Sequence, residues 1–375
     1  MRGNLRRLIP MLLIGTGIII CCVGSLSAAT IIGTAPGVST GNALLDATLS
    51  AVIADAFNTA ILDANNTLSK YHDQQQLARG FGNANVYSSQ VASFQGFQNY
   101  DHFAVAAGAM VGVHMPSSDP NYYENLDDEL EKTGDIFAGV GASVSFLNVG
   151  INAKSIRPGL YLNFKFGSAS VEPVDEVKFS NTIVGVGANY TLAKPMTGSF
   201  LFKWRGLSLG TGLIYHNSDV TYAVDIDKIT EEFVVNYEGY KVSGDVVIDP
   251  SVNLELKVKT LTVPVDIMTS VRLLWLFNVT LGAGMDFNFG NTDLILISNG
   301  SVTIDIQQTP IELDIKTTPG TAVVDGSTLD VSPSFARFRL NTGVGFNFGP
   351  LKIDIPVSYY PRTGIAAGVT LGVVL

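Results

Sequence analysis

Residues 335–375 alternate almost without interruption between apolar side chains and polar, charged or glycine residues. Three segments, 335–348, 351–360 and 363–375, carry this pattern and are separated only by short turns. A period of two predicts β-strands with one apolar and one polar face. A sheet that stopped on such a strand would leave an unpaired edge, so the pattern favours closure of the sheet into a barrel.

The beginning of the chain resembles an export signal. Three arginines precede a short apolar run, and small residues follow near Ala28, so residues 1–28 are predicted to be a signal peptide. A transmembrane anchor is the alternative. Lipidation at Cys21 is disfavoured, because the residue before it is not small. With 46% hydrophobic and 15% charged residues, the chain does not have the composition of a disordered protein.

Loss of the signal peptide changes the charge and the cysteine content. Residues 1–28 contain three arginines and no acidic residue, so the net charge of −10 becomes −13, which disfavours nucleic acid as a partner. Both cysteines also leave, which excludes disulfides, thiol catalysis and cysteine metal sites, and no cofactor is expected. No later run is long and apolar enough for a spanning helix, so a membrane-spanning form must be a β-barrel.

Residues 29–100 are expected to form an N-terminal segment ahead of a barrel at residues 101–375. Within it, apolar residues of 43–69 recur at spacings of three and four, which predicts an amphipathic helix. Packing against the protein is favoured over a membrane-surface role, because the polar face lacks Lys and Arg. A plug in the lumen, a brace and a dimerising helix remain alternatives. The polar stretch 72–100 is predicted to fold inside the lumen.

Ten segments from residue 103 onward fit tilted transmembrane strands of about 9–11 residues. They are 103–115, 136–146, 159–167, 183–192, 200–215, 254–267, 274–289 and the three C-terminal segments. Long and short connections alternate, as in outer-membrane barrels with long external loops. Two long connections hold further alternating runs, 232–249 and 293–314, which either extend the barrel as hairpins or add spanning strands. The predicted fold is mainly β, a transmembrane antiparallel β-barrel of about 10–14 strands with an N-terminal amphipathic helix.

Several charged residues share the polar phase of the predicted strands and should face the lumen. They are Asp266, Arg337, Arg339, Lys352 and Asp354. They either form a charge ladder that rigidifies the interior or set the selectivity of a pore. Glycines on this phase are predicted to keep the lumen face small or to let the strands bend. Pro264 and Pro356 lack an N–H for the ladder, which predicts a bulge or kink at each.

The long connections are rich in acidic residues and poor in lysine. The candidates for binding a partner are Asp127, Asp128, Glu129, Glu131, Glu231 and Glu232. Such a surface attracts basic partners or divalent cations, although a solvated acidic surface that only keeps the protein soluble is the simpler reading. His114 and His216 lie near strand ends, where a hydrolytic site is an alternative. Strand-end histidines are more often structural, and the protein is expected not to be an enzyme.

Three stretches, 77–112, 263–290 and 343–360, resemble the spirochaete surface-exposed outer-membrane proteins typified by a leptospiral surface adhesin family. The resemblance implies an outer-membrane protein exposed on the cell surface that attaches to host extracellular matrix, such as laminin, or to plasminogen. It brings no defined binding residues. The chain departs from the usual barrel pattern by ending in Leu375 instead of an aromatic residue.

Two functions are therefore expected. The first is a surface adhesin that binds its ligand through acidic external loops. The second is a porin or a transporter of small apolar solutes, with the N-terminal segment as a plug, so that deletion of residues 43–99 would increase conductance. In both cases outer-membrane lipid and the barrel-assembly machinery are expected partners.

Overall fold

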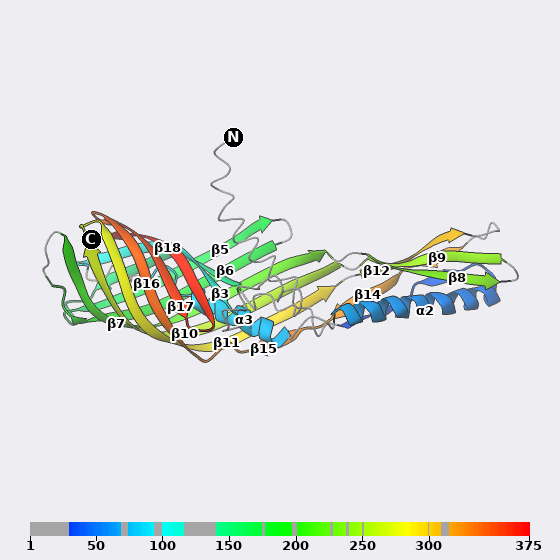
Figure 1. Ribbon diagram of the computed structural model, residues 1–375, viewed down its shortest axis with the longest axis horizontal. Coiled ribbons are helices and arrows are strands. Elements are labelled where there is room, and N and C mark those ends of the chain that lie inside the picture. Colours follow the sequence, from blue (N-terminus) through cyan, green and yellow to red (C-terminus); the bar gives the residue numbers. More distant parts are fainter. Residues whose placement is uncertain are drawn as a thin grey trace, which may run out of the picture.

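The computed structural model is an elongated molecule, with a β-barrel at one end and a narrower stalk at the other (Figure 1). It describes residues 30–68, 74–93, 100–115, 140–174, 177–196, 201–225, 228–237, 240–249, 251–298, 300–308 and 315–375.

Ten antiparallel strands form the barrel. They are β3 (Phe103–His114), β4 (Val140–Asn152), β5 (Leu160–Val174), β6 (Val177–Ala193), β7 (Phe202–Asp225), β10 (Ser251–Leu273), β11 (Phe277–Ser298), β16 (Ala336–Phe348), β17 (Leu351–Tyr360) and β18 (Gly364–Val374). β3 pairs with β18 and β10 pairs with β11, so the ring closes. The predicted fold class is confirmed, at the lower end of the expected strand number.

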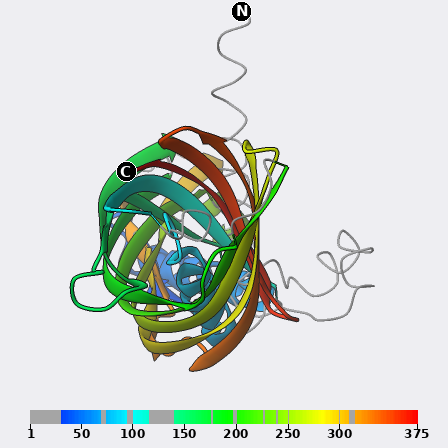
Figure 2. The ribbon, with the colours of Figure 1, turned by 90° about the vertical axis from the view of Figure 1, so that its left-hand side faces the viewer.

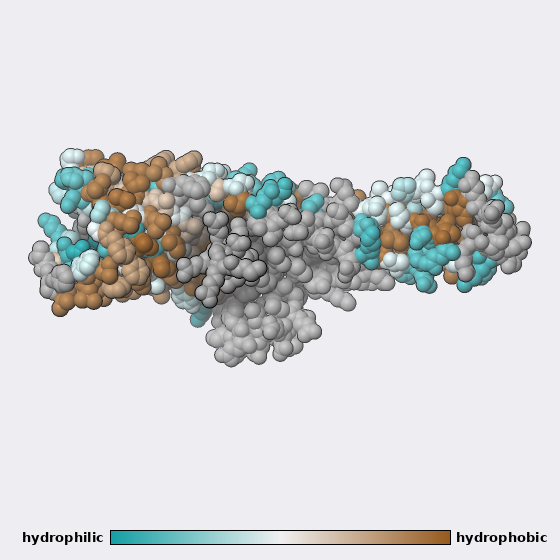
Figure 3. All heavy atoms as spheres, turned by 90° about the horizontal axis from the view of Figure 1, so that it is seen from above, coloured by the Kyte–Doolittle hydropathy of each residue, from teal (hydrophilic) through white to brown (hydrophobic). Residues whose placement is uncertain are grey.

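The outside of the barrel is apolar. Side chains on alternate positions of the strands are strongly exposed, and they gather into a hydrophobic surface over the barrel (Figure 3). Examples are Phe164 (46%), Val186 (54%), Leu281 (56%), Val344 (47%), Ile355 (43%) and Leu371 (51%). A continuous apolar surface of this kind is unfavourable in water and matches the lipid-facing band of a transmembrane barrel.

A charge placed on this surface should destabilise the barrel in the membrane. Leu281 lies near the middle of the part of β11 that pairs with β16, Phe277–Phe287, so we expect Leu281→Arg to lower the free energy of unfolding by about 2–4 kcal/mol in lipid bilayers. Leu329 is similarly exposed (58%) but lies in β15 (Thr328–Val331), beyond the end of the β11–β16 pairing, and Leu329→Arg is the matched control. Urea titration in liposomes measures both variants. Equal losses would contradict the lipid-facing assignment.

Glycines inside the barrel make room for polar side chains on the neighbouring strand. A Cβ at Gly284 would overlap the carboxylate of Asp266, and a Cβ at Gly345 would overlap that of Asp354. Each pair is in register across its two strands. The glycines therefore keep the lumen face small, which is the first of the two roles expected for them.

The stalk begins where three barrel strands continue past their neighbours. β7, β10 and β11 have 24, 23 and 22 residues, whereas β17 has 10. The stalk sheet has the order β1 (Thr30–Thr34), β14 (Gly320–Asp325), β12 (Gly300–Gln308), β9 (Tyr240–Asp249) and β8 (Ile229–Tyr237). A short pair, β2 (Gly37–Ser39) with β13 (Lys316–Thr318), accompanies it. Of the two alternating runs in the long connections, 232–249 thus forms the β8–β9 hairpin beyond the barrel. The described part of 293–314 forms the end of β11 and strand β12, which pairs with β9 and β14 in the stalk sheet, so neither described run adds a spanning strand.

Helix α2 (Ala43–Leu68) lies along this sheet, outside the barrel (Figure 1). Its apolar stripe is buried in one cluster with apolar residues of β8, β9, β12 and β14. The stripe consists of Leu45, Leu49, Ile53, Phe57 and Ala60. The section Ala43–Leu62 has the length and composition of a membrane-spanning helix, contrary to the expectation from sequence, but its stripe is used to cover the stalk sheet.

The start of α2 is fixed by side-chain oxygens. The amide oxygen of Asn42 accepts hydrogen bonds from the backbone N–H groups of Leu44 (3.1 Å) and Leu45 (3.3 Å), as an N-cap does. One turn later the Asp46 carboxylate accepts hydrogen bonds from the hydroxyl and backbone N–H of Thr40, both at 2.6 Å. These bonds, the hydroxyl of Thr40 first, lower the pKa of Asp46.

Removal of this cap should loosen α2. Asn42→Ala is expected to cost the helix about 1 kcal/mol, because two N–H groups lose their acceptor. Amide hydrogen exchange of the first turn of α2 measures the loss, with Asn42→Ser as the control that keeps an acceptor. Unchanged protection in Asn42→Ala would show that packing alone holds the helix start.

The helix α3 (Gln74–Ser88) lies inside the barrel, where it contacts strands on several sides of the wall (Figure 2). Every residue from Gly80 to Ala92 is buried. The expectation that residues 72–100 fold inside the lumen is confirmed for the described part, and residues 72–73 and 94–99 lie outside the described residues.

The two prolines do not produce bulges. The pairing of β10 with β7 skips residues 263–264, and that of β17 with β18 skips residues 355–356, but the register is the same on both sides of each gap. The missing N–H therefore interrupts the ladder without inserting a residue. Of the two predicted outcomes, the bulge is wrong at both positions, and the kink stays a prediction.

Candidate functional site

The centre of the lumen holds a buried ionic network around Arg339. The guanidinium is fully buried and lies 2.6 Å from both carboxylate oxygens of Asp266 and 3.3 Å from Asp286. Asn341 donates a further hydrogen bond to Asp266 at 3.3 Å. Gly284 of β11 is in register with Asp266 of β10 on one side and with Arg339 of β16 on the other. The Asp266 carboxylate therefore reaches Arg339 across a position that has no side chain.

This network continues to α3 through two tyrosines. The hydroxyl of Tyr360 donates to Asp286 at 3.0 Å, and its ring stacks on Tyr87 of α3 with centroids 3.8 Å apart. The hydroxyl of Tyr87 in turn lies 3.2 Å from Nδ1 of His114. The charge cluster of the wall and the helix in the lumen are therefore one connected structure.

The two histidines considered for hydrolysis both face this helix. His216 is buried, with one ring nitrogen 3.1 Å from the backbone oxygen of Asn85 and the other next to the amide of Asn181. His114 contacts Tyr87, as described above. The structure gives both histidines the geometry of groups that hold α3 in place.

The other charged residues expected in the lumen are spread along the wall. Lys352 is buried and donates to the backbone oxygen of Gly349 at 2.7 Å, close to the short-turn rim. Asp354 is buried beside Gly345. Arg337 is half-buried at the stalk end of β16 and donates to the hydroxyl of Ser334. Two of the five, Asp266 and Arg339, are joined by a direct ion pair.

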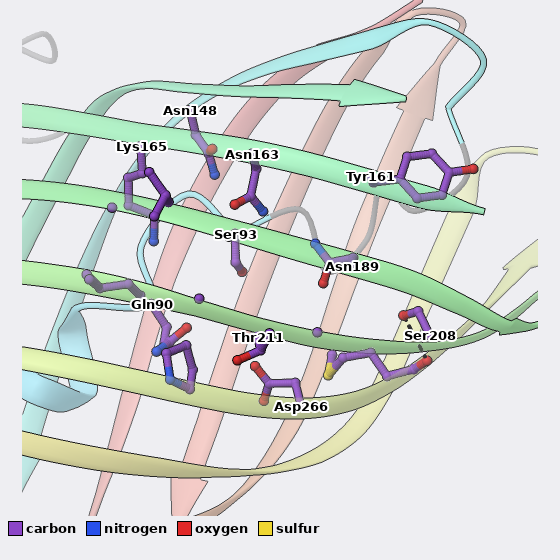
Figure 4. Close-up of a pocket in the computed structure, with 18 of the residues that line it drawn as sticks. Gln90, Ser93, Asn148, Tyr161, Asn163, Lys165, Asn189, Ser208, Thr211 and Asp266 are labelled. Atoms are coloured by element: carbon purple, nitrogen blue, oxygen red, sulfur yellow. Dashed lines mark hydrogen bonds between the residues drawn. The ribbon is translucent and has the colours of Figure 1, made fainter. Parts of the chain in front are cut away.

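A cavity of about 100 Å³ lies in the lumen between the end of α3 and the wall formed by β4, β5, β6, β7 and β10 (Figure 4). Amide and hydroxyl side chains converge on it, together with Lys165 and Asp266. Those labelled in the close-up are Gln90, Ser93, Asn148, Tyr161, Asn163, Lys165, Asn189, Ser208, Thr211 and Asp266. Such a lining suits a polar molecule.

The acidic candidates fall into two groups. Asp127, Asp128, Glu129 and Glu131 lie outside the described residues. Glu231 and Glu232 lie in β8 of the stalk, but adjacent residues of a strand point to opposite faces. Glu231 is on the face of the buried Phe233 and Val246, and Glu232 is exposed on the outer face.

Glu232 belongs to a row of three carboxylates on the outer face of the stalk sheet. It is in register with Asp245 of β9, which is in register with Asp305 of β12. Directly opposed like charges destabilise a sheet. Among the described residues, the amide of Gln307 donates to Asp245, and no Lys or Arg forms an ion pair with the row. The row therefore presents a local negative surface away from α2.

Sequence reasoning missed two of the central residues. Asp286 and Lys165 lie on the polar phase of their strands, with Asn288 and Asn163 as neighbours on that phase, so the alternation contained the signal. The alternation does not tell how far along the barrel a residue lies or which residue of the neighbouring strand it faces. These two quantities place Asp286 beside Arg339 and Lys165 beside the turn after α3.

Comparison with solved structures finds other barrels at low similarity. The translocator domain of the autotransporter NalP from Neisseria meningitidis is 12% identical, with 76% of this chain and 92% of that chain covered and a TM-score of 0.29. The CymD monoaromatic hydrocarbon channel is 10% identical, with coverages of 80% and 97% and a TM-score of 0.25. The Ralstonia pickettii toluene transporter TbuX is 7% identical, with coverages of 80% and 98% and a TM-score of 0.24. No function follows from likenesses of this size.

Sequence comparison is more specific. No curated protein matches the chain significantly. A family profile, in contrast, matches residues 25–375, which include the barrel, the lumen helix and the whole stalk. The chain belongs to the Lsa36-like family.

Proposed function

We propose that the barrel anchors the protein in the outer membrane and that the stalk projects from the cell as the part that binds a host macromolecule. The observation that carries this proposal is the continuation of β7, β10 and β11 from the barrel wall into the stalk. Continuous strands transmit the rigidity of the barrel to the stalk sheet, whereas flexible loops would not. A rigid, preorganised surface loses less entropy when it binds a partner.

The direction of the stalk follows from the two rims. One rim carries short turns, such as 274–276 and 349–350, together with the start of β3. The other rim carries the stalk. In transmembrane barrels the short turns face the periplasm and the long connections face outward, which supports a stalk outside the cell.

The partner is proposed to be a host matrix protein or plasminogen, as the resemblance to leptospiral surface adhesins implied. The row of Glu232, Asp245 and Asp305 favours a basic segment of that partner, because opposite charges steer association and fix its register. Of the two acidic candidates that lie in the described residues, this surface includes Glu232 and leaves out Glu231, which is on the opposite face of β8.

Cysteine labelling tests the orientation, because both cysteines of the chain, Cys21 and Cys22, lie within the predicted signal peptide. Thr303→Cys places a thiol on the exposed outer face of the stalk, and Lys154→Cys places one in an exposed short turn. A membrane-impermeant maleimide should label Thr303→Cys on intact cells and Lys154→Cys only after permeabilisation. The reverse pattern would overturn the proposed orientation.

Removal of the three charges of the carboxylate row tests whether this row binds the partner. The variant Glu232→Gln, Asp245→Asn, Asp305→Asn should bind immobilised laminin or plasminogen at least about tenfold more weakly at low salt, because it lacks three charges at the contact. Glu172→Gln removes an exposed acid of β5, outside the stalk sheet, and is the matched control. Equal binding by the triple variant and the wild type would exclude the row as the binding surface.

Passage of a solute through the barrel is the second candidate, and the cavity beneath α3 is the observation that favours it. Its converging amides and hydroxyls fit a polar solute better than the apolar solute considered from sequence.

A further inference from the structure

The end of the plug and the barrel wall together form the polar side of the lumen cavity. Asn148 of β4 and Lys165 of β5 are directly opposite each other in register. The amide nitrogen of Asn148 donates to the backbone oxygen of Ala92 at 2.5 Å, and the Lys165 ammonium donates to that of Ser89 at 3.1 Å. Both side chains thus hold the turn after α3 while they also line the cavity (Figure 4).

Several polar atoms at this place have no hydrogen-bond partner among the described residues. They are Oδ1 of Asn148, Nε2 of Gln90 and Oγ of Ser93, all in residues that line the cavity. Asn148 and Gln90 are only 1% and 5% exposed. Buried polar groups are nearly always paired, so a cavity that collects an unpaired donor, an unpaired acceptor and a hydroxyl is suited to a polar ligand.

The charges at the cavity define the ligand further. Lys165 is 7% exposed and has no carboxylate within ion-pair distance among the described residues. The other lining charge, Asp266, has both oxygens held by Arg339. Lys165 is therefore the uncompensated charge of the described lining, and it retains donors beyond the one given to Ser89. A buried cation of this kind favours an anionic partner.

We propose that this cavity binds a small hydroxycarboxylate. The ligand carboxylate would accept hydrogen bonds from the Lys165 ammonium and the Gln90 amide, and its hydroxyl would donate to Oδ1 of Asn148. A zwitterionic amino acid fits less well, because its ammonium would lie close to Lys165 and Arg339. The volume of about 100 Å³ limits the ligand to a few heavy atoms, since a cavity of about 150 Å³ holds benzene. The inference is independent of the role proposed for the stalk.

Binding of glycolate to the detergent-solubilised full chain, followed by saturation-transfer NMR, tests this site. Ethylene glycol, which lacks the carboxylate, is the neutral control ligand. Glycolate should bind and ethylene glycol should not. Absence of glycolate binding, or equal binding of both molecules, would overturn the proposal.

Two variants locate the binding. Lys165→Met should weaken glycolate binding roughly tenfold or more, because the charge-assisted hydrogen bond is lost. Lys154→Met removes an exposed lysine of a short turn and should bind as the wild type does. If Lys165→Met fails to fold, Gln90→Glu serves instead, because Nε2 of Gln90 has no partner to lose and the new carboxylate repels the ligand. Unchanged binding in a folded Lys165→Met or Gln90→Glu variant would show that glycolate binds elsewhere.

Discussion

Replacement of Arg339 by methionine is expected to lower the free energy of unfolding by about 3–5 kcal/mol. The substitution leaves the volume nearly filled but removes the guanidinium that both Asp266 and Asp286 face. Asp286 is fully buried, so its carboxylate would lose its cation without gaining water. Urea titration in detergent micelles, followed by the fluorescence of the two tryptophans, measures the loss.

Compensating substitutions separate the charge from the packing. The variant Arg339→Met, Asp266→Asn, Asp286→Asn should recover most of the lost stability, because neutral amides are less costly to bury than unpaired carboxylates. Lys194→Met removes an exposed cation and should change stability by less than about 0.5 kcal/mol. If the triple variant is no more stable than Arg339→Met alone, the role of Arg339 is steric.

Deletion of residues 30–99 is expected to convert the barrel from a closed to a conducting form. The deletion removes β1, β2, α2 and α3 together, so that no helix remains in the lumen. Planar-bilayer recordings should show stepwise conductance for this variant and none for the full chain. The steps should be small, because about eight strands enclose only enough space for side chains and about sixteen are needed for a wide channel.

The control deletion is residues 30–42, which removes β1 and β2 and leaves α3 in the barrel. It should remain closed. Equal conductance of the full chain and the larger deletion would contradict the role of α3 as a plug. This outcome would leave the binding role of the stalk untouched.

The barrel could be predicted from the sequence because all its strands meet the same two environments. Each strand has lipid on one side and the lumen on the other. In β16, for example, the exposed Phe338 and Leu340 alternate with the buried Arg339 and Asn341. The stalk could not be predicted in the same way. Val246 and Ile248 show the same alternation, but their buried face meets a helix. A period of two reports that a strand has two different faces and does not report what covers them.

The pairings inside the lumen were also beyond the sequence. Asp266 and Arg339 are 73 positions apart and meet only because β10, β11 and β16 are aligned so that Gly284 lies between them. A slip of one residue in either pairing would turn the charges outward. The helix at residues 43–69 was recognised from its spacing, but its position on the stalk depends on strands more than 150 residues later, such as β9.

The route of the chain ahead of β3 limits how the protein is assembled. Asn65 of α2 is tied to β1 in the stalk, α3 occupies the lumen, and His102 is bonded to the backbone of Leu375 at the opposite rim. The polypeptide is thus threaded through its own ring. The seam between β3 and β18, the first and last strands of that ring, encloses this thread in the folded protein. Assembly therefore has to carry the leading segment to the stalk side as well as close the seam.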